Sequence, residues 1–135
     1  MNACVLDTDV VIAALDRSDR HHSSAAAGFA RFETEGVELL ICSVNYAEAL
    51  VRPSADEQTL RAATEAINSL GIRVHAPDAA TARLAAARRH LGISLADGFA
   101  LATAERAGAD LASFDKRVRR AIGKVGIPLT PALRR

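Results

Sequence analysis

The chain has 135 residues, of which 50% are hydrophobic and 24% are charged. This composition is typical of a folded globular protein, it excludes a disordered chain, and the length suits one domain with a proper core. Lys and Arg total 17 while Asp and Glu total 16, so the net charge of +1 says little about partners. We expect a single domain over residues 1–135.

Cys4 and Cys42 are the only cysteines, and both lie in apolar runs. We therefore expect buried thiols, with neither a disulfide framework nor a zinc site, which suits a reducing cytosol. Asp7 and Asp9 break the only N-terminal apolar run, which argues against a secretory signal. Since no run reaches about 18 apolar residues, no membrane span is predicted, and we expect a cytoplasmic protein.

The first half of the chain predicts strands that alternate with helices. A short buried strand ends at Leu6, and Thr8 or Asp9 can cap a short helix that runs to Leu15. Apolar patterns and stop signals then predict a helix over 25–35, a strand over 38–42, a helix that Ser43 caps and Pro53 ends, a helix over 56–70 and a strand over 72–75.

The second half continues the alternation. It predicts helices over 78–90 and 94–107, a strand over 110–113, a helix from 115 to about 122 and a fifth strand over 125–129. Strands that alternate with helices, and that are almost wholly apolar, are typical of an α/β fold whose parallel sheet is covered on both faces.

Four acidic residues fall where such a sheet binds ligands, outside the carboxyl ends of its strands. Asp7 ends the first strand, Glu48 follows the second, Asp97 lies in the first turn of a helix, and Asp115 follows the fourth strand. Carboxylates gathered at one site raise each other's pKa values, and a divalent cation removes the conflict. Ligands that are all oxygen atoms favour Mg²⁺ or Mn²⁺, which can activate water at a phosphoryl centre.

Each acid also has a structural interpretation. Asp9 is more simply a helix cap than a metal ligand. Ser94 and Asp97 fit a capping box, Asp115 can cap the helix that it precedes, and Glu48 can be a solvated helix position. The acids therefore indicate a site only when they are taken together.

Four stretches, in this order, resemble the PIN domain family, and in size and layout the chain is similar to the toxin of a VapBC-type toxin–antitoxin pair. They are Val5–Ile12, Ser43–Glu48, Leu95–Ala104 and Ser113–Arg117. The resemblance covers nearly the whole chain. It implies a three-layer α/β/α fold with a mostly parallel sheet of about five strands, and a metal-dependent endoribonuclease.

The resemblance also implies roles for single residues. Its catalytic acidic cluster would be Asp7, Glu48, Asp97 and Asp115, with Thr8 and Ser113 as supporting hydroxyls. Asp7 and Asp97 would bind Mg²⁺ or Mn²⁺ directly, while Glu48 and Asp115 would position the attacking water. The family implies a homodimer, an RNA substrate and a cognate antitoxin whose C-terminal segment occludes the site. The chain departs from the family at Gly98, where Ala or another helix former is usual.

A basic cluster directly follows Asp115. It contains Lys116, Arg117, Arg119, Arg120 and Lys124, and Arg134 and Arg135 end the chain. Beside a metal site these side chains can hold RNA phosphates, although a solvated helix face is the alternative. Aromatic residues make up 4% of the chain, so base stacking is a poor candidate for recognition. His21 and His22 are expected to be exposed loop residues.

Two other functions remain open. The stretch Asp7–Val11 also resembles the nucleophile motif of haloacid-dehalogenase-type phosphatases, in which Asp7 would form an aspartyl-phosphate and Asp9 would act as acid and base. The paired late acids that this family uses for Mg²⁺ are missing from the sequence. The second alternative is a catalytically silent PIN-like module that only binds RNA or protein. Asp9→Asn separates the two enzymes, because the change should abolish a phosphatase but only weaken a PIN nuclease.

Overall fold

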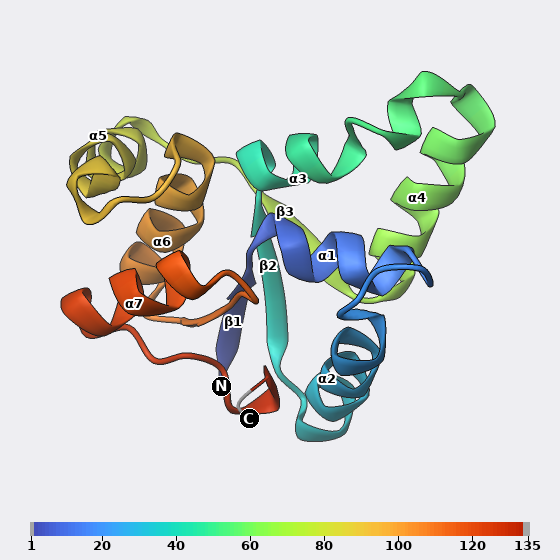
Figure 1. Ribbon diagram of the computed structural model, residues 1–135, viewed down its shortest axis with the longest axis horizontal. Coiled ribbons are helices and arrows are strands. Elements are labelled where there is room, and N and C mark those ends of the chain that lie inside the picture. The colour runs from blue at the N-terminus through green and yellow to red at the C-terminus, as the bar shows by residue number, and fades with distance from the viewer. Residues whose placement is uncertain (1, 134–135) are drawn as a thin grey trace.

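The structure, a computed structural model, describes residues 2–133. Over these residues the sheet has four parallel strands in the order β3-β2-β1-β4. The strands are β1 (Ala3–Leu6), β2 (Glu38–Cys42), β3 (Ile72–His75) and β4 (Asp110–Ala112). The predicted α/β fold with a parallel sheet is confirmed, and Figure 1 shows β1 and β2 at its centre.

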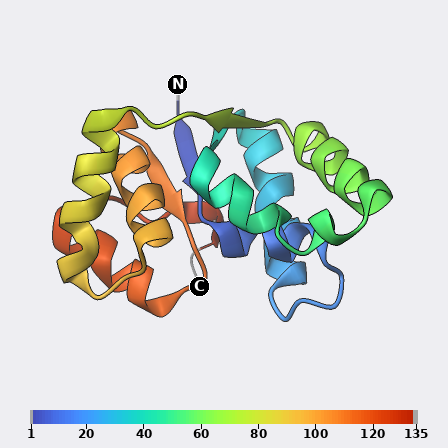
Figure 2. The same cartoon turned by 90° about the horizontal axis from the view of Figure 1, so that it is seen from above.

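Helices cover both faces of this sheet (Figure 2). The α-helices are α1 (Thr8–Leu15), α2 (His22–Glu35), α3 (Ser43–Leu50), α4 (Glu57–Ser69), α5 (Ala79–Ala87), α6 (Leu95–Ala107) and α7 (Lys116–Val125). Short 3-10 turns lie at Pro53–Ala55, Arg88–Leu91 and Pro131–Leu133. In Figure 1, α1 to α4 lie on one side of the sheet and α5 to α7 on the other.

Alternate residues of the strands supply two hydrophobic cores. Cys4, Leu6 and Ile41 face α1, α2 and α4, while Val5 and Leu40 face α6 and α7. Successive side chains of a strand point to opposite faces, so a sheet that is covered on both faces needs apolar residues at nearly every position. This explains the almost wholly apolar strands that the sequence shows. Cys4 and Cys42 are buried free thiols, as expected.

The predicted fifth strand over 125–129 is wrong. Val125 ends α7, and Gly126 reverses the chain in the left-handed conformation with a φ of 75°. Leu129 then forms only an isolated parallel bridge with Leu111. Pro128 lacks an N–H group and contributes only its carbonyl, which accepts from the Leu111 amide at 3.1 Å. The segment therefore runs along β4 without becoming a strand.

Two predicted helix starts also need correction. The Ser43 side chain does not cap α3, because the helix begins at Ser43 itself and its N-cap residue, Cys42, makes no side-chain hydrogen bond. Helix α2 begins at His22, three positions before the predicted start at Ala25.

The close packing of α5 against α6 explains why position 98 is a glycine. A Cβ atom added at Gly98 would lie 2.7 Å from the carbonyl oxygen of Ala85, closer than real Cβ atoms come to any neighbour. Only glycine lets the two helix backbones approach so closely. The departure from the family's usual residue is therefore tied to the position of α6, which carries Asp97.

Candidate active site

The first carboxylate of the site ends β1 and begins α1. Asp7 is 2% exposed. Its Oδ1 accepts a hydrogen bond from the Thr8 amide at 2.9 Å, which makes Asp7 the N-cap of α1. Its Oδ2 accepts from the Ser113 hydroxyl at 2.7 Å. The prediction that Thr8 or Asp9 caps this helix is therefore wrong, because the carboxylate at the end of the strand does so.

Asp9 instead holds the loop that follows β4. Its Oδ2 accepts from the Phe114 amide at 3.1 Å. Its Oδ1 is buried and has no hydrogen-bond partner among the described residues. The sequence analysis did not predict this contact. The one signal for it is that Asp9 is a second acid inside an apolar run. The structure therefore adds a fifth carboxylate to the predicted set of four.

His21 and His22 are half-buried, so the prediction of exposed loop residues is wrong. The His21 ring stacks on Phe114 with centroids 4.3 Å apart and planes 7° from parallel. His22 Nδ1 lies 2.7 Å from the carbonyl oxygen of Ala13. Both rings therefore help to fix the loops beside Asp9.

Ser113 joins the two acids at the ends of β1 and β4. Its hydroxyl donates to Asp7 and accepts from the Asp115 amide at 3.1 Å. Asp115 caps α7 by accepting from the Arg117 amide at 2.7 Å. Arg117 Nη2 also lies 3.5 Å from Asp115 Oδ2. One hydroxyl thus connects the end of β1 to the loop that follows β4.

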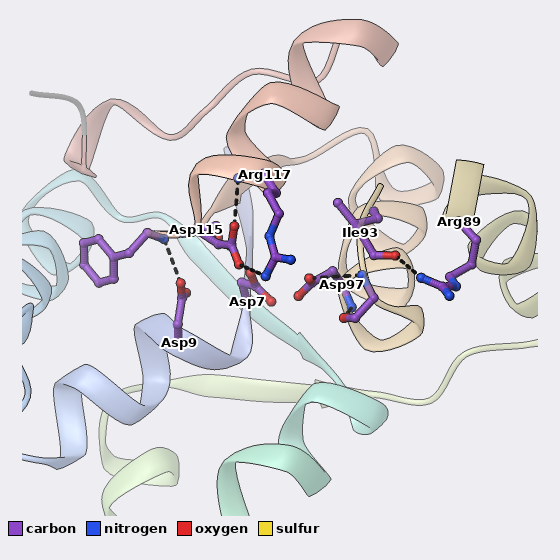
Figure 3. Close-up of polar contacts among 10 residues, drawn as sticks. Asp7, Asp9, Arg89, Ile93, Asp97, Asp115 and Arg117 are labelled. Carbon is purple, nitrogen blue, oxygen red and sulfur yellow. Dashed lines mark hydrogen bonds and ion pairs between the residues drawn. The ribbon is translucent and has the colours of Figure 1, made fainter. Parts of the chain in front are cut away.

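Asp97 lies at the start of α6 and forms the predicted capping box. Its amide donates to the Ser94 hydroxyl at 3.1 Å, and its Oδ2 accepts from the Ser94 amide at 3.4 Å. The carboxylate remains half-buried, and Figure 3 shows it on the side of the site opposite Asp9, with Asp7 and Asp115 between them.

Glu48 is exposed on α3 and is linked to the site through Thr8. Its Oε1 accepts from the Thr8 hydroxyl at 2.5 Å. The same hydroxyl accepts from the side-chain amide of Asn45 at 3.2 Å. Asn45 Nδ2 also donates to the carbonyl oxygen of Ala96 at 3.0 Å. No sequence pattern singles out Asn45, because a polar residue in the first turn of a helix is ordinarily solvated.

The carboxylates raise one another's pKa values. Burial, followed by the charges of Asp9 and Asp97, raises the pKa of Asp7 well above its usual range, against the hydrogen bonds from Ser113 and Thr8. Burial and the charges of Asp115 and Asp97 raise the pKa of Asp9 to about 6, although the Phe114 amide opposes this. Burial also raises the pKa of Asp97. The site therefore concentrates more negative charge than its surroundings compensate.

The donor set fits a hard divalent cation. It consists of carboxylate oxygens, one of them the buried unpaired Oδ1 of Asp9, and such ligands suit Mg²⁺ or Mn²⁺. No three His, Cys, Asp or Glu side chains in residues 2–133 are already arranged as ligands to a single ion. Glu48, Asp97 and Asp115 each accept one of the hydrogen bonds described above through a single carboxylate oxygen, and a carboxylate has further lone pairs with which to bind a cation.

The basic residues that follow Asp115 divide into two kinds. Lys116, Arg117 and Arg120 are exposed. Arg119 is half-buried, and its guanidinium donates to the carbonyl oxygens of Ser113 at 2.7 Å and Leu133 at 3.4 Å. Arg119 therefore also holds the loop after β4. The last basic positions, 134 and 135, lie outside the described residues.

The sequence matches the PIN domain family over residues 4–124. The chain belongs to this family. The match covers the ends of β1 and β4, α3 and the start of α6, and so includes every carboxylate described above. No curated protein matches the sequence.

Several solved structures share the PIN fold of this chain. FitAcB from Neisseria gonorrhoeae is 19% identical, with a TM-score of 0.70 over 96% of this chain and 97% of the other. VapBC2 from Rickettsia felis, bound to a promoter DNA fragment, is 15% identical, with a TM-score of 0.74 over 95% and 97%. VapC20 from Mycobacterium tuberculosis, described as a sarcin–ricin loop cleaving toxin, is 20% identical, with a TM-score of 0.68 over 87% and 94%.

The family match bears on the alternatives. It gives no support to a haloacid-dehalogenase-type phosphatase, and the Asp9 carboxylate accepts from a backbone amide of the neighbouring loop. A catalytically silent PIN module would share this fold, and a measurement of RNA cleavage distinguishes it from a nuclease. No helix within residues 2–133 is both long enough and apolar enough to cross a membrane.

Proposed function

We propose that this PIN domain is a metal-dependent endoribonuclease that cuts RNA phosphodiester bonds. The observation that carries the proposal is the convergence of Asp7, Asp9, Asp97 and Asp115 from three segments at the carboxyl edge of the sheet, where Asp7, Asp9 and Asp97 have raised pKa values. Burying so many acids together costs free energy, which a bound cation offsets.

The acids would have two roles, binding the metal ion and orienting the attacking water. Asp7 and Asp97 would hold a Mg²⁺ or Mn²⁺ ion, because Asp7 is buried and the charge of Asp97 is one of those that raise its pKa. Asp115 and the exposed Glu48 would orient the attacking water. Ser113 and Thr8 would keep Asp7 and Glu48 in place through the hydrogen bonds described above. When bound, the ion would lower the pKa of water and stabilise negative charge at phosphorus.

Exposed cations beside Asp115 would bind the RNA backbone. Lys116, Arg117 and Arg120 lie in or next to the first turns of α7, and their charges can pair with phosphates that flank the cut. Arg119 would contribute less, because two backbone carbonyls already occupy its guanidinium. This arrangement predicts binding that depends on salt rather than on base identity.

We also propose that the protein is a toxin, that it forms a homodimer, and that a cognate antitoxin covers its site. The support is that a structure with this fold from Klebsiella pneumoniae is described as a toxin–antitoxin complex, and that VapC20 is described as a toxin. The chain also offers a groove of about 610 Å³ between α1, α3 and α4, lined by Ile12, Ala49 and Ala63 and reaching Glu48. An antitoxin segment in this groove would end beside the site.

The test is cleavage of total cellular RNA by the purified protein, with Mg²⁺, Mn²⁺ or EDTA, followed by sequencing of new 5′ ends. Asp97→Asn is the inactive variant. Asp78→Asn is its matched control, because Asp78 also caps a helix but lies outside the acidic cluster. We expect discrete cuts that need metal, persist in Asp78→Asn and disappear in Asp97→Asn. Cuts of equal yield in a folded Asp97→Asn protein would refute the site, and no cuts by the wild type would favour a silent module.

A further inference from the structure

Asn45 is a fully buried polar side chain among three segments that carry acids. It is 0% exposed in the first turn of α3, and its Nδ2 makes both of its hydrogen bonds outside that helix. One bond reaches the Thr8 hydroxyl at the start of α1, at 3.2 Å. The other reaches the carbonyl oxygen of Ala96 at the start of α6, at 3.0 Å.

These two bonds lead directly to three of the site's acids. The Thr8 hydroxyl has one proton, which it donates to Glu48 Oε1 at 2.5 Å while it accepts from Asn45. The Thr8 amide donates to Asp7 Oδ1. Ala96 directly precedes Asp97 in α6. One side-chain amide therefore links Asp7, Glu48 and Asp97, which lie on separate segments.

Packing alone does not account for an asparagine here. Its Nδ2 must face the Ala96 carbonyl, which can only accept, so the amide orientation is fixed. The Oδ1 atom is then left buried, without a hydrogen-bond partner in residues 2–133. An unpaired buried carbonyl costs free energy of folding. A leucine, which has a similar shape, would fill the space without this cost.

We propose that Asn45 is a positioning residue that sets the spacing of Asp7 and Asp97, so that both can hold one divalent cation, with Glu48 placed beside them. This inference rests on the proposed function. Asn45 itself makes no contact with the cation and acts only through Thr8 and Ala96. It complements Ser113, which links Asp7 to Asp115 on the other side of the site.

The experiment compares the wild type with Asn45→Leu and with Thr103→Val as control. Thr103 is 2% exposed in α6 and bonds only within its own helix, to the Phe99 carbonyl at 2.7 Å. Three quantities are measured without RNA: the Mn²⁺ affinity by calorimetry, the metal-free amide exchange at the start of α6, and the resistance to urea.

We expect Asn45→Leu to resist urea at least as well as the wild type. Its Mn²⁺ affinity should fall at least tenfold, and the Asp97 and Gly98 amides should exchange at least tenfold faster. Thr103→Val should match the wild type in affinity and in exchange at these amides. A loss of Mn²⁺ affinity without a loss of stability is an outcome that a purely structural role cannot produce.

Wild-type Mn²⁺ affinity in Asn45→Leu would overturn the inference. If the wild type itself bound no Mn²⁺, the proposed function would fail, and the metal-free exchange would then decide the positioning role by itself. Faster exchange at the start of α6 in Asn45→Leu would uphold the link between the segments, and unchanged exchange would overturn it.

Discussion

Asp7 and Asp9 interrupt an apolar run for two different reasons. Asp7 ends a strand, caps the next helix and accepts from Ser113. Asp9 accepts from the loop after β4 and keeps one oxygen buried without a partner in the described chain. Both carboxylates therefore stabilise the local structure, but the local hydrogen bonds do not fully offset the free-energy cost of burying them. A side chain that caps a helix can thus also belong to a site, so a structural role does not exclude a functional one.

The raised pKa of Asp9 predicts a pH dependence of stability. The folded protein holds a proton on Asp9 up to a pH of about 6, whereas the unfolded chain releases it near 3.8. Between these values the native state binds more protons, so the free energy of unfolding falls as the pH rises through this window. The loss attributable to this group is at most about 3 kcal/mol, because one pKa unit corresponds to 1.36 kcal/mol.

Asp9→Asn tests this prediction. Asparagine keeps an oxygen that can accept from the Phe114 amide but does not ionise. In urea titrations with EDTA, the variant should gain stability over the wild type as the pH rises from about 4 to about 7, and the difference should be smallest at the acid end. Comparing the two proteins cancels the exposed acids that both share. A difference that stayed constant with pH would contradict the assignment.

At the level of single elements, Gly98 and Gly123 make a matched pair. Replacing a helical glycine with alanine ordinarily stabilises a protein by up to about 1 kcal/mol. Gly123 in α7 has nothing within 4 Å of an added Cβ, so Gly123→Ala should show this gain. Gly98 meets the Ala85 carbonyl at 2.7 Å, so Gly98→Ala should instead destabilise by about 1–3 kcal/mol. Urea midpoints measure both, and a gain at Gly98 would show that α5 and α6 can separate without cost.

Variants in α7 can separate an effect on RNA binding from an effect on the stability of the fold. In the Asp97→Asn background, where RNA should stay intact, Lys116→Ala should lower the salt slope of RNA affinity by about 0.7 if Lys116 neutralises one phosphate of a single strand. Arg119→Ala should mainly reduce stability, because its guanidinium holds the Ser113 and Leu133 carbonyls. Arg61→Ala, on the exposed face of α4, is the charge-matched control. An equal change of slope in all three variants would mean that α7 is not the RNA surface.

The elements also show which parts of the structure can be predicted from the sequence alone. Apolar periodicity and capping signals placed the helices and β1 to β4, because these depend on local preferences. The segment 125–129 has the apolar composition of a buried strand, and its apolar residues do pack in the core. It forms no full ladder, because a ladder also depends on how the segment lies against its partner strand. The links through Asn45 and Asp9 join residues more than 35 positions apart, and no local pattern predicts such contacts.

In the whole molecule, the C-terminal segment joins the two cores that the sheet separates. Ile127 belongs to the core on the α6 and α7 face, and Leu133 belongs to the core beneath α2. Between them, the Thr130 amide donates to the Leu111 carbonyl at 2.9 Å, and Arg31 Nη1 donates to the Pro131 carbonyl at 3.0 Å. The C-terminal segment therefore passes around the β4 edge of the sheet and packs into the cores on both of its faces.

Leu133→Ala should consequently weaken the whole domain. Leu133 is 4% exposed and lies against Gly28 of α2, which has no side chain of its own to occupy the space that Leu133 would leave. Removing a buried leucine side chain costs about 2–5 kcal/mol. Val51→Ala is the control, since Val51 is 68% exposed and should change stability by less than about 0.5 kcal/mol. Urea unfolding followed by circular dichroism and by Tyr46 fluorescence should give one shared transition at a lower midpoint. Two separate transitions would mean instead that the segment couples two layers able to unfold independently.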